Sequence, residues 1–104
     1  MVLDIYKVAS IFPKEEIYGL TSQLRRAAVS ISSNIAEGAC RSSDKELKYF
    51  MTIAMGSASE VDYQFLLSRD LGYVPASIYD ETALRIIEIK KMLAGFIKQL
   101  KAEG

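Results

Sequence analysis

Apolar residues recur every three or four positions along most of the chain, a spacing that is typical of amphipathic helices. Two prolines, Pro13 and Pro75, interrupt this pattern at positions that separate predicted helices. The pattern predicts an all-α fold with four helices, of which the first is less than half as long as the last two. A first helix this short leaves part of the core of a four-helix bundle uncovered. The predicted helices are Val2 to about Ile11, Glu15 or Ile17 to Glu37, the residues after Ser42 to about Leu71, and Pro75 to about Leu100.

The second predicted helix contains ten consecutive residues, Ala27 to Ala36, without a charged side chain. A surface helix in a small protein normally keeps a charged face in water, so a helix without one is usually packed on more than one side. We therefore expect its apolar stripe to face the core and its opposite face to meet a second copy of the chain. The stripe is Ile17, Leu20, Leu24, Ala27, Ala28, Ile31 and Ile35, and the opposite face is Ser22, Arg26, Val29, Ser33 and Ala36.

Local signals predict where the helices begin and end. Gly38 stands where a glycine commonly ends a helix, and we expect it to terminate the second helix. Ser43 and Glu46 match a capping box at the start of the third helix. We also expect Leu3 to add to the apolar surface of the first helix.

The composition limits the kinds of protein that this chain can be. The 104 residues suit a single domain over positions 1–104, and 13 basic residues balance 13 acidic residues, which argues against strong non-specific binding to a polyanion. No apolar run approaches the ~20 residues that a membrane span needs. The single cysteine, Cys40, permits no intramolecular disulfide, and it is interpreted as an inert thiol. We expect a cytoplasmic protein that does not enter a membrane.

No catalytic constellation stands out in the sequence. The chain has no histidine, which excludes His-based acid–base catalysis and ordinary zinc sites. Ser42 and Lys45 form an S-x-x-K match, but helix capping explains it and the partner motifs of that enzyme class are missing. We therefore predict no enzyme activity, no cofactor, no metal and no small-molecule substrate.

Four polar residues of the second helix are the first candidate site: Arg25, Arg26, Asn34 and Glu37. One interpretation is that they form hydrogen-bonded pairs between helices or between subunits, because a charge beside a buried surface needs a partner. The other interpretation is that the arginines contact phosphate groups. We favour the first, since two arginines neutralise little charge.

The fourth helix supplies a second candidate, a basic patch formed by Arg85, Lys90, Lys91, Lys98 and Lys101. Acidic residues gather around the turn between the third and fourth helices, so the two ends of the bundle are expected to differ in sign. A solvated lysine face is the simpler interpretation. In a ring of several copies, however, the patch is repeated and could bind RNA through avidity.

The second helix also resembles a known family signature. The run from Phe12 to Ile31, FPKEEIYGLTSQLRRAAVSI, and the continuation SNIAEG from Ser33 to Gly38 are similar to the four-helix bundle proteins encoded in intervening sequences of 23S ribosomal RNA genes. Further matches are the segments Lys45–Leu47, Ala54–Glu60 and Leu71–Tyr73. Two departures stand out: Ser32 replaces a proline that is usual in the family, and family members usually begin about ten residues earlier.

The resemblance implies a left-handed antiparallel up-down-up-down bundle that assembles into a ring, typically a homopentamer, with no enzyme activity. Related proteins of diversity-generating retroelements are basic and are thought to bind nucleic acid, a profile that this neutral chain matches poorly. We therefore expect a homo-oligomeric scaffold or interaction protein, and RNA binding is the alternative hypothesis.

Overall fold

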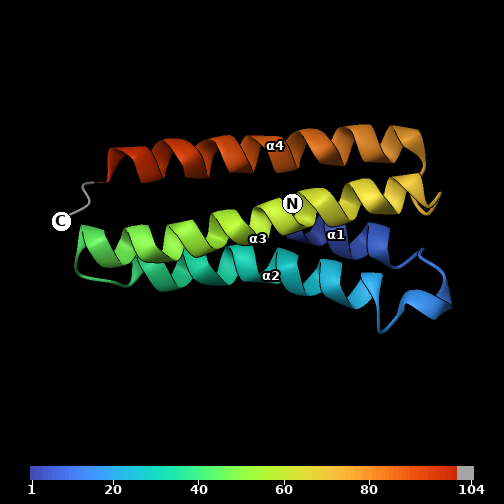
Figure 1. The fold of residues 1–104 in the computed structure, drawn as a ribbon, viewed down its shortest axis with the longest axis horizontal. Coiled ribbons are helices and arrows are strands. Elements are labelled where there is room, and N and C mark those ends of the chain that lie inside the picture. The colour runs from blue at the N-terminus through green and yellow to red at the C-terminus, as the bar shows by residue number, and fades with distance from the viewer. Residues whose placement is uncertain (101–104) are drawn as a thin grey trace.

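The computed structural model describes residues 1–100, which form four α-helices and one short 3-10 helix (Figure 1). The elements are α1 (Val2–Ala9), η1 (Lys14–Glu16), α2 (Leu20–Ala39), α3 (Asp44–Asp70) and α4 (Ala76–Gln99). The all-helical class and the short first helix are therefore confirmed. The molecule is elongated, with extents of 46 × 24 × 17 Å, because the three long helices lie nearly along one axis.

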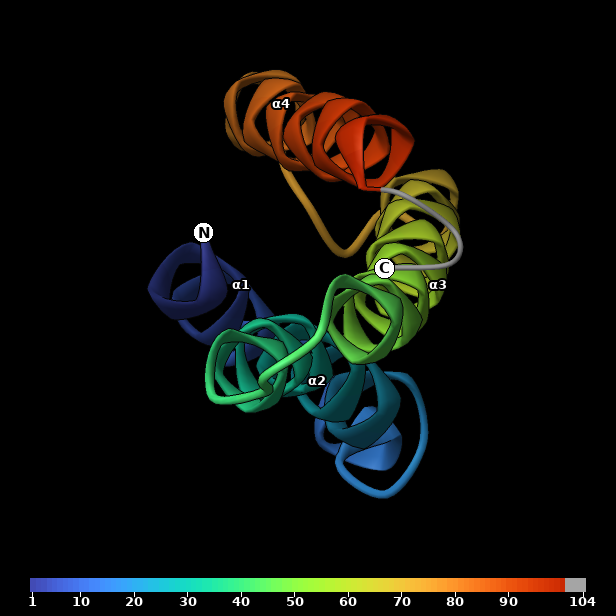
Figure 2. The same cartoon turned by 90° about the vertical axis from the view of Figure 1, so that its left-hand side faces the viewer.

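Each helix packs mainly on its neighbour in the chain: α1 on α2, α2 on α3, and α3 on α4. Figure 2 shows the result end-on as an open arc with α1 and α4 at its two tips. Helices α2 and α3 run antiparallel, because Ser30 and Arg26 of α2 meet Ser57 and Glu60 of α3 in reverse order. The open side of this arc decides which apolar residues stay uncovered.

The core lies inside the arc and is made of the apolar stripes that the sequence predicts. Leu24 and Ile31 of α2, Val61 and Phe65 of α3 and Ile86 of α4 are all buried. The small residues Ala54, Ala58 and Ala28 lie between these larger side chains and are also buried. Small residues at these positions allow the helix backbones to approach closely, which a closely packed interior requires.

The ends of α3 follow the local signals in the sequence. The Ser43 hydroxyl accepts the backbone N–H of Glu46 at 3.2 Å, which confirms the predicted N-terminal cap. At the other end, Gly72 has φ of +82°, and the N–H groups of Gly72 and Tyr73 donate to the carbonyls of Arg69 and Ser68. This is the Schellman arrangement, which needs a residue in the left-handed region and therefore favours glycine.

The predicted start of the second helix is wrong. The helix begins at Leu20, after a separate 3-10 turn over Lys14–Glu16 and a non-helical backbone at Gly19. The carboxylate of Glu16 accepts the backbone N–H of Leu20 at 3.2 Å and so caps α2 from outside it. As a consequence Ile17 lies in the connection, 57% exposed, and contributes nothing to the core stripe.

Three further expectations are also wrong. Gly38 lies inside α2 with a negative φ and is buried against α3, so it permits close approach and does not end the helix. Leu3 is 75% exposed because the inner face of α1 is formed by Ile5 and Val8. Ile35 remains 38% exposed to solvent, because α1 is too short to reach it.

Candidate functional site

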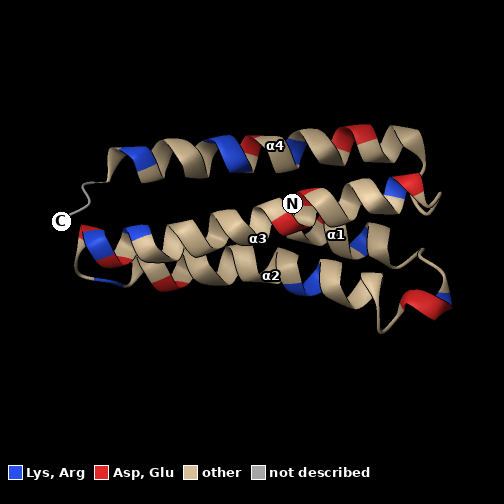
Figure 3. Cartoon of the chain, in the orientation of Figure 1, with Lys and Arg blue, Asp and Glu red and all other residues tan. Residues whose placement is uncertain are grey.

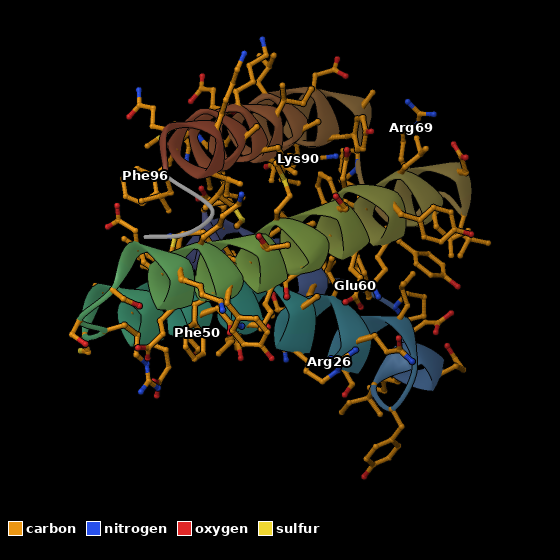
Figure 4. The ribbon with its side chains drawn as sticks, turned by 60° about the vertical axis from the view of Figure 1, so that its left-hand side comes forward. Arg26, Phe50, Glu60, Arg69, Lys90 and Phe96 are labelled. Carbon is orange, nitrogen blue, oxygen red and sulfur yellow. The ribbon has the colours of Figure 1, made fainter. Side chains whose placement is uncertain are left out.

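The two arginines of α2 contact different neighbouring helices. Arg25 Nη2 donates to the backbone carbonyl of Tyr6 in α1 at 3.2 Å, and its guanidinium lies 5.0 Å from the centre of the Tyr6 ring. Arg26 points the other way and pairs with Glu60 of α3, with 3.6 Å between Arg26 Nη2 and Glu60 Oε2. Figure 4 labels both residues of this pair, Arg26 on α2 and Glu60 on α3. Both arginines therefore have partners on other helices of the same chain, as the interpretation of paired polar residues expects.

Asn34 and Glu37 also have partners, and each of these lies only four residues away in the sequence. Asn34 Nδ2 donates to the carbonyl oxygen of Ser30 at 2.8 Å and to the Ser30 hydroxyl at 3.1 Å. The Ser30 and Ser57 hydroxyls in turn share a hydrogen bond of 2.8 Å across the α2–α3 contact. Glu37 Oε2 lies 2.6 Å from Arg41 Nη2. The four predicted residues thus serve separate local contacts and do not converge on one site.

The basic patch of α4 is partly neutralised. Arg85 forms ion pairs with Asp4 of α1 and with Glu81, and Lys90 Nζ lies 3.1 Å from Asp62 Oδ2 of α3. Lys91 and Lys98 are exposed on the outer surface, whereas Lys101 lies outside the described residues. Figure 3 shows acidic and basic groups mixed in the N-terminal half of α4 and basic groups alone in its C-terminal half. The structure therefore leaves fewer unpaired cations in the patch than the sequence predicts.

The outer face of α2 and α3 has few charges. Val29, Ser33 and Ala36 of α2 are exposed, as are Tyr49 and Tyr63 of α3. In Figure 3 a charge-free stretch of both helices separates the charged groups nearer their ends. The Arg26–Glu60 pair is neutral as a unit. This face, which we call the outer α2–α3 face, is the surface that the sequence predicts to meet another copy.

A groove opens between α2 and α4, beyond the N-terminal end of α1. Its cavity measures about 430 Å³. The groove exists because α1 has 8 residues, whereas α2 has 20 and α4 has 24. The uncovered core that the sequence predicts is therefore present. The main lining residues are Ile31, Ile35, Ile89, Met92, Leu93 and Phe96.

A hydrogen bond fastens the connection before α2 to the residues that follow α3. The Tyr73 hydroxyl donates to Glu16 Oε2 at 2.9 Å, while the other oxygen of the same carboxylate caps α2. This hydrogen bond raises the pKa of Tyr73 above its ordinary value, since the neutral phenol is the donor. Phe12 packs on the same ring, with 5.5 Å between the ring centres. These contacts are structural, and nothing in the sequence pattern pointed to them.

No three or more His, Cys, Asp or Glu residues among residues 1–100 converge on a point where a metal ion could bind. None of the helices in the same range is both long enough and apolar enough to cross a membrane. Cys40 is a free thiol on the surface.

A family model described as 23S rRNA-intervening sequence protein matches residues 1–95. The chain belongs to this family. The signature residues that suggested the resemblance now have positions: Asn34 supports the serine pair between α2 and α3, and Gly38 lies against the side chains of α3. In this family member the strong pattern of the second helix therefore marks close helix packing. Helix α2 also runs without interruption through Ser32, where the family usually has proline.

A solved structure supports the same fold. It is a protein with unknown function from the S23 ribosomal protein family of Bacteroides thetaiotaomicron, with a TM-score of 0.82 and 24% sequence identity. The match covers 94% of this chain and 89% of that one. At this identity the likeness shows the fold of this 23S rRNA-intervening sequence family member and nothing about its role. Among curated proteins, none matches the chain.

Proposed function

We propose that this protein is a non-enzymatic scaffold that acts as a homo-oligomer. The observation that carries the proposal is the outer α2–α3 face, which is exposed and poor in charge. Val29 and Tyr63 lie in this face with much of their surface in water, although each could be buried against another copy. The family resemblance adds the expectation of a left-handed bundle and a ring of five copies, and the composition adds the expectation of a cytoplasmic protein.

The residues of the face suit contact between helices. Ser33, Ala36, Gly56 and Ser59 are small and exposed, so another helix could approach closely. A substituted Cβ at Gly56 would meet nothing within 4 Å, so the fold itself does not require a glycine there. Depletion of charge at the centre of a surface is also what distinguishes the core of an interface from the rest of a protein surface.

RNA binding, the alternative hypothesis, has less support. A contact driven by phosphate groups needs several free cations, and its affinity falls steeply with salt. Arg85 and Lys90 are engaged with carboxylates of the same chain, so the patch offers fewer cations than the sequence suggests. A gel shift against structured ribosomal RNA over a salt series tests it. Binding that strengthens at low salt would revive the hypothesis, and no binding at low salt would dismiss it.

Light scattering coupled to size exclusion at micromolar concentration tests the scaffold proposal. The expected result is a mass several times the 11.6 kDa of one chain. The variant Val29→Lys places a charge in the centre of the face and should lower that mass. Leu84→Lys is the matched control, because Leu84 is an exposed apolar residue of α4 that lies outside the face. A monomeric wild-type protein would refute the proposal.

A further inference from the structure

We propose that the ion pair between Arg85 of α4 and Asp4 of α1 is a salt-sensitive latch, which holds shut the seam between these two helices. When the pair is screened or broken, α1 moves away from α4 while it stays packed on α2. The latch therefore sets how often the apolar side chains beneath it reach solvent. This motion takes place within one chain and does not depend on the proposed oligomer.

Helices α1 and α4 face each other without packing closely. Each packs mainly on its neighbour in the chain, α1 on α2 and α4 on α3, and in Figure 2 the two form the tips of the arc. A cavity of about 290 Å³ lies between them, with Val8 and Ile11 on one wall and Ile78 and Thr82 on the other. Because side chains across such a space lack the close contacts of a packed core, dispersion forces hold this seam only weakly.

Arg85 supplies the one ion pair that joins α1 to α4 within residues 1–100. Its Nη1 pairs with Asp4 Oδ2, and its Nη2 lies 3.5 Å from Glu81 Oε1, one turn earlier on α4. Glu81 therefore holds the guanidinium without crossing the seam. The Arg85 side chain is 49% exposed and that of Asp4 is 31% exposed, so dissolved salt reaches the pair. Asp4 Oδ2 also lies 3.8 Å from the Met1 amino nitrogen, so a substitution of Arg85 is the change that isolates the seam.

The side of α1 that meets α2 is held by contacts of another kind. Arg25 of α2 donates from Nη2 to the backbone carbonyl of Tyr6 at 3.2 Å, and its guanidinium lies 5.0 Å from the centre of the Tyr6 ring. Ile5 of α1 is completely buried. Salt screens the attraction between two exposed charges, whereas a hydrogen bond to a neutral carbonyl and the burial of an apolar side chain are not weakened in this way. We therefore expect salt to open the α4 side of α1, with its α2 side as the hinge.

The population of the open seam is expected to respond to the latch by a small factor. Exposed ion pairs contribute little to stability, so breaking this one should raise the open population about 1.5- to 5-fold. Two buried side chains can report the opening, because Thr82 of α4 is 5% exposed, Val8 of α1 is 7% exposed and both line the cavity. A thiol at either position would react only when the seam opens.

Thiol labelling in the full chain tests the latch. With Cys40→Ser and Thr82→Cys in place, the rate of labelling by iodoacetamide, an uncharged reagent, should rise about 1.5- to 5-fold when Arg85→Met is added. A similar rise should appear without Arg85→Met when NaCl increases from about 0.02 M to about 1 M, which shortens the Debye length to roughly 3 Å. The Arg85→Met protein should show no such response to salt. A rate that neither change alters would overturn the proposal.

Matched variants separate the latch from a general loss of stability. Glu81→Gln removes the partner of Arg85 that lies on α4 itself, so it should not raise the labelling rate at position 82. Ser68→Cys, in place of Thr82→Cys, puts the thiol at a fully buried position of α3 that does not line the cavity, and Arg85→Met should leave its rate unchanged. Val8→Cys is a second reporter on the facing wall and should behave as position 82 does. Equal acceleration at positions 68 and 82 would show general loosening and overturn the proposal, as would acceleration by Glu81→Gln equal to that by Arg85→Met.

Discussion

Gly38 and Gly95 allow the packing of this bundle to be tested with one substitution made at two positions. Both glycines lie within helices and both have ordinary helical backbone, so alanine is conformationally acceptable at each. Their surroundings differ. A Cβ at Gly38 would lie 2.7 Å from Met51 Cε, 3.1 Å from Leu47 Cδ1 and 3.1 Å from Phe50 Cβ, whereas a Cβ at Gly95 would meet nothing within 4 Å.

These distances set the expected signs. Glycine to alanine in a helix interior contributes up to about 1 kcal/mol, and Gly95→Ala should gain most of it. At Gly38 the same gain is offset by overpacking, which costs about 1–3 kcal/mol. Met51 can move its terminal methyl group, but the Cβ of Phe50 can move only with the backbone of α3. Gly38→Ala should therefore destabilise the fold by about 0–2 kcal/mol, which leaves a gap of about 1–3 kcal/mol between the two variants.

Urea unfolding followed by far-ultraviolet circular dichroism measures this gap. All proteins should be compared at one low concentration, because self-association adds to apparent stability. The midpoint should fall in the order Gly95→Ala, wild type, Gly38→Ala with an unchanged slope. Gly56→Ala is a second control, since that position is equally open. If Gly38→Ala proved as stable as Gly95→Ala, the argument that α3 approaches α2 closely at Gly38 would be wrong.

Three further predictions concern polar contacts. Ser43→Ala removes the cap of α3 and should cost about 1 kcal/mol in urea unfolding, with no loss expected if the cap is dispensable. The hydrogen bond to Glu16 raises the pKa of Tyr73, so the stability that this bond contributes is fully present below the ordinary value of 10.0 and is lost as pH rises through the raised value. Above that pH the wild type should therefore lose more stability than Tyr73→Phe. Parallel pH profiles of the two proteins would contradict this. Lys90→Met breaks the ion pair with Asp62 and should change the free energy of unfolding by less than about 1 kcal/mol, because both side chains are about one-third exposed. The change should be smaller still in high salt. A larger change in thermal unfolding would show a stronger coupling than surface ion pairs provide.

Features that depend on residues close together in the sequence could be predicted from it. The cap at Ser43 and the stripe of α3 through Ala54, Val61 and Phe65 follow from residue type and spacing within one helix. The uncovered core was also predictable, because helix length follows from the pattern and a short helix covers less of its neighbours. The resemblance in the second helix led correctly to the family.

Features that depend on tertiary contacts could not be predicted in the same way. Ile17 fits the stripe of the second helix by spacing. The helix begins only at Leu20, where the Glu16 carboxylate caps it, so Ile17 lies outside the helix. Gly38 matched a helix end, and only the position of α3 shows that its missing side chain serves packing. The basic patch looked coherent because the sequence does not show that Asp4 and Asp62 lie beside Arg85 and Lys90.

The packing of each helix on its chain neighbour has a consequence for the order of folding. Contacts between consecutive helices close short loops, so the relative contact order is low, and proteins of this kind fold quickly. The α2–α3 hairpin carries the most extensive contact and can form before either flank is in place. Helix α1, with only eight residues, is expected to open most readily and to show the least protected amide protons in hydrogen exchange. The groove between α2 and α4 would then widen in the locally opened state.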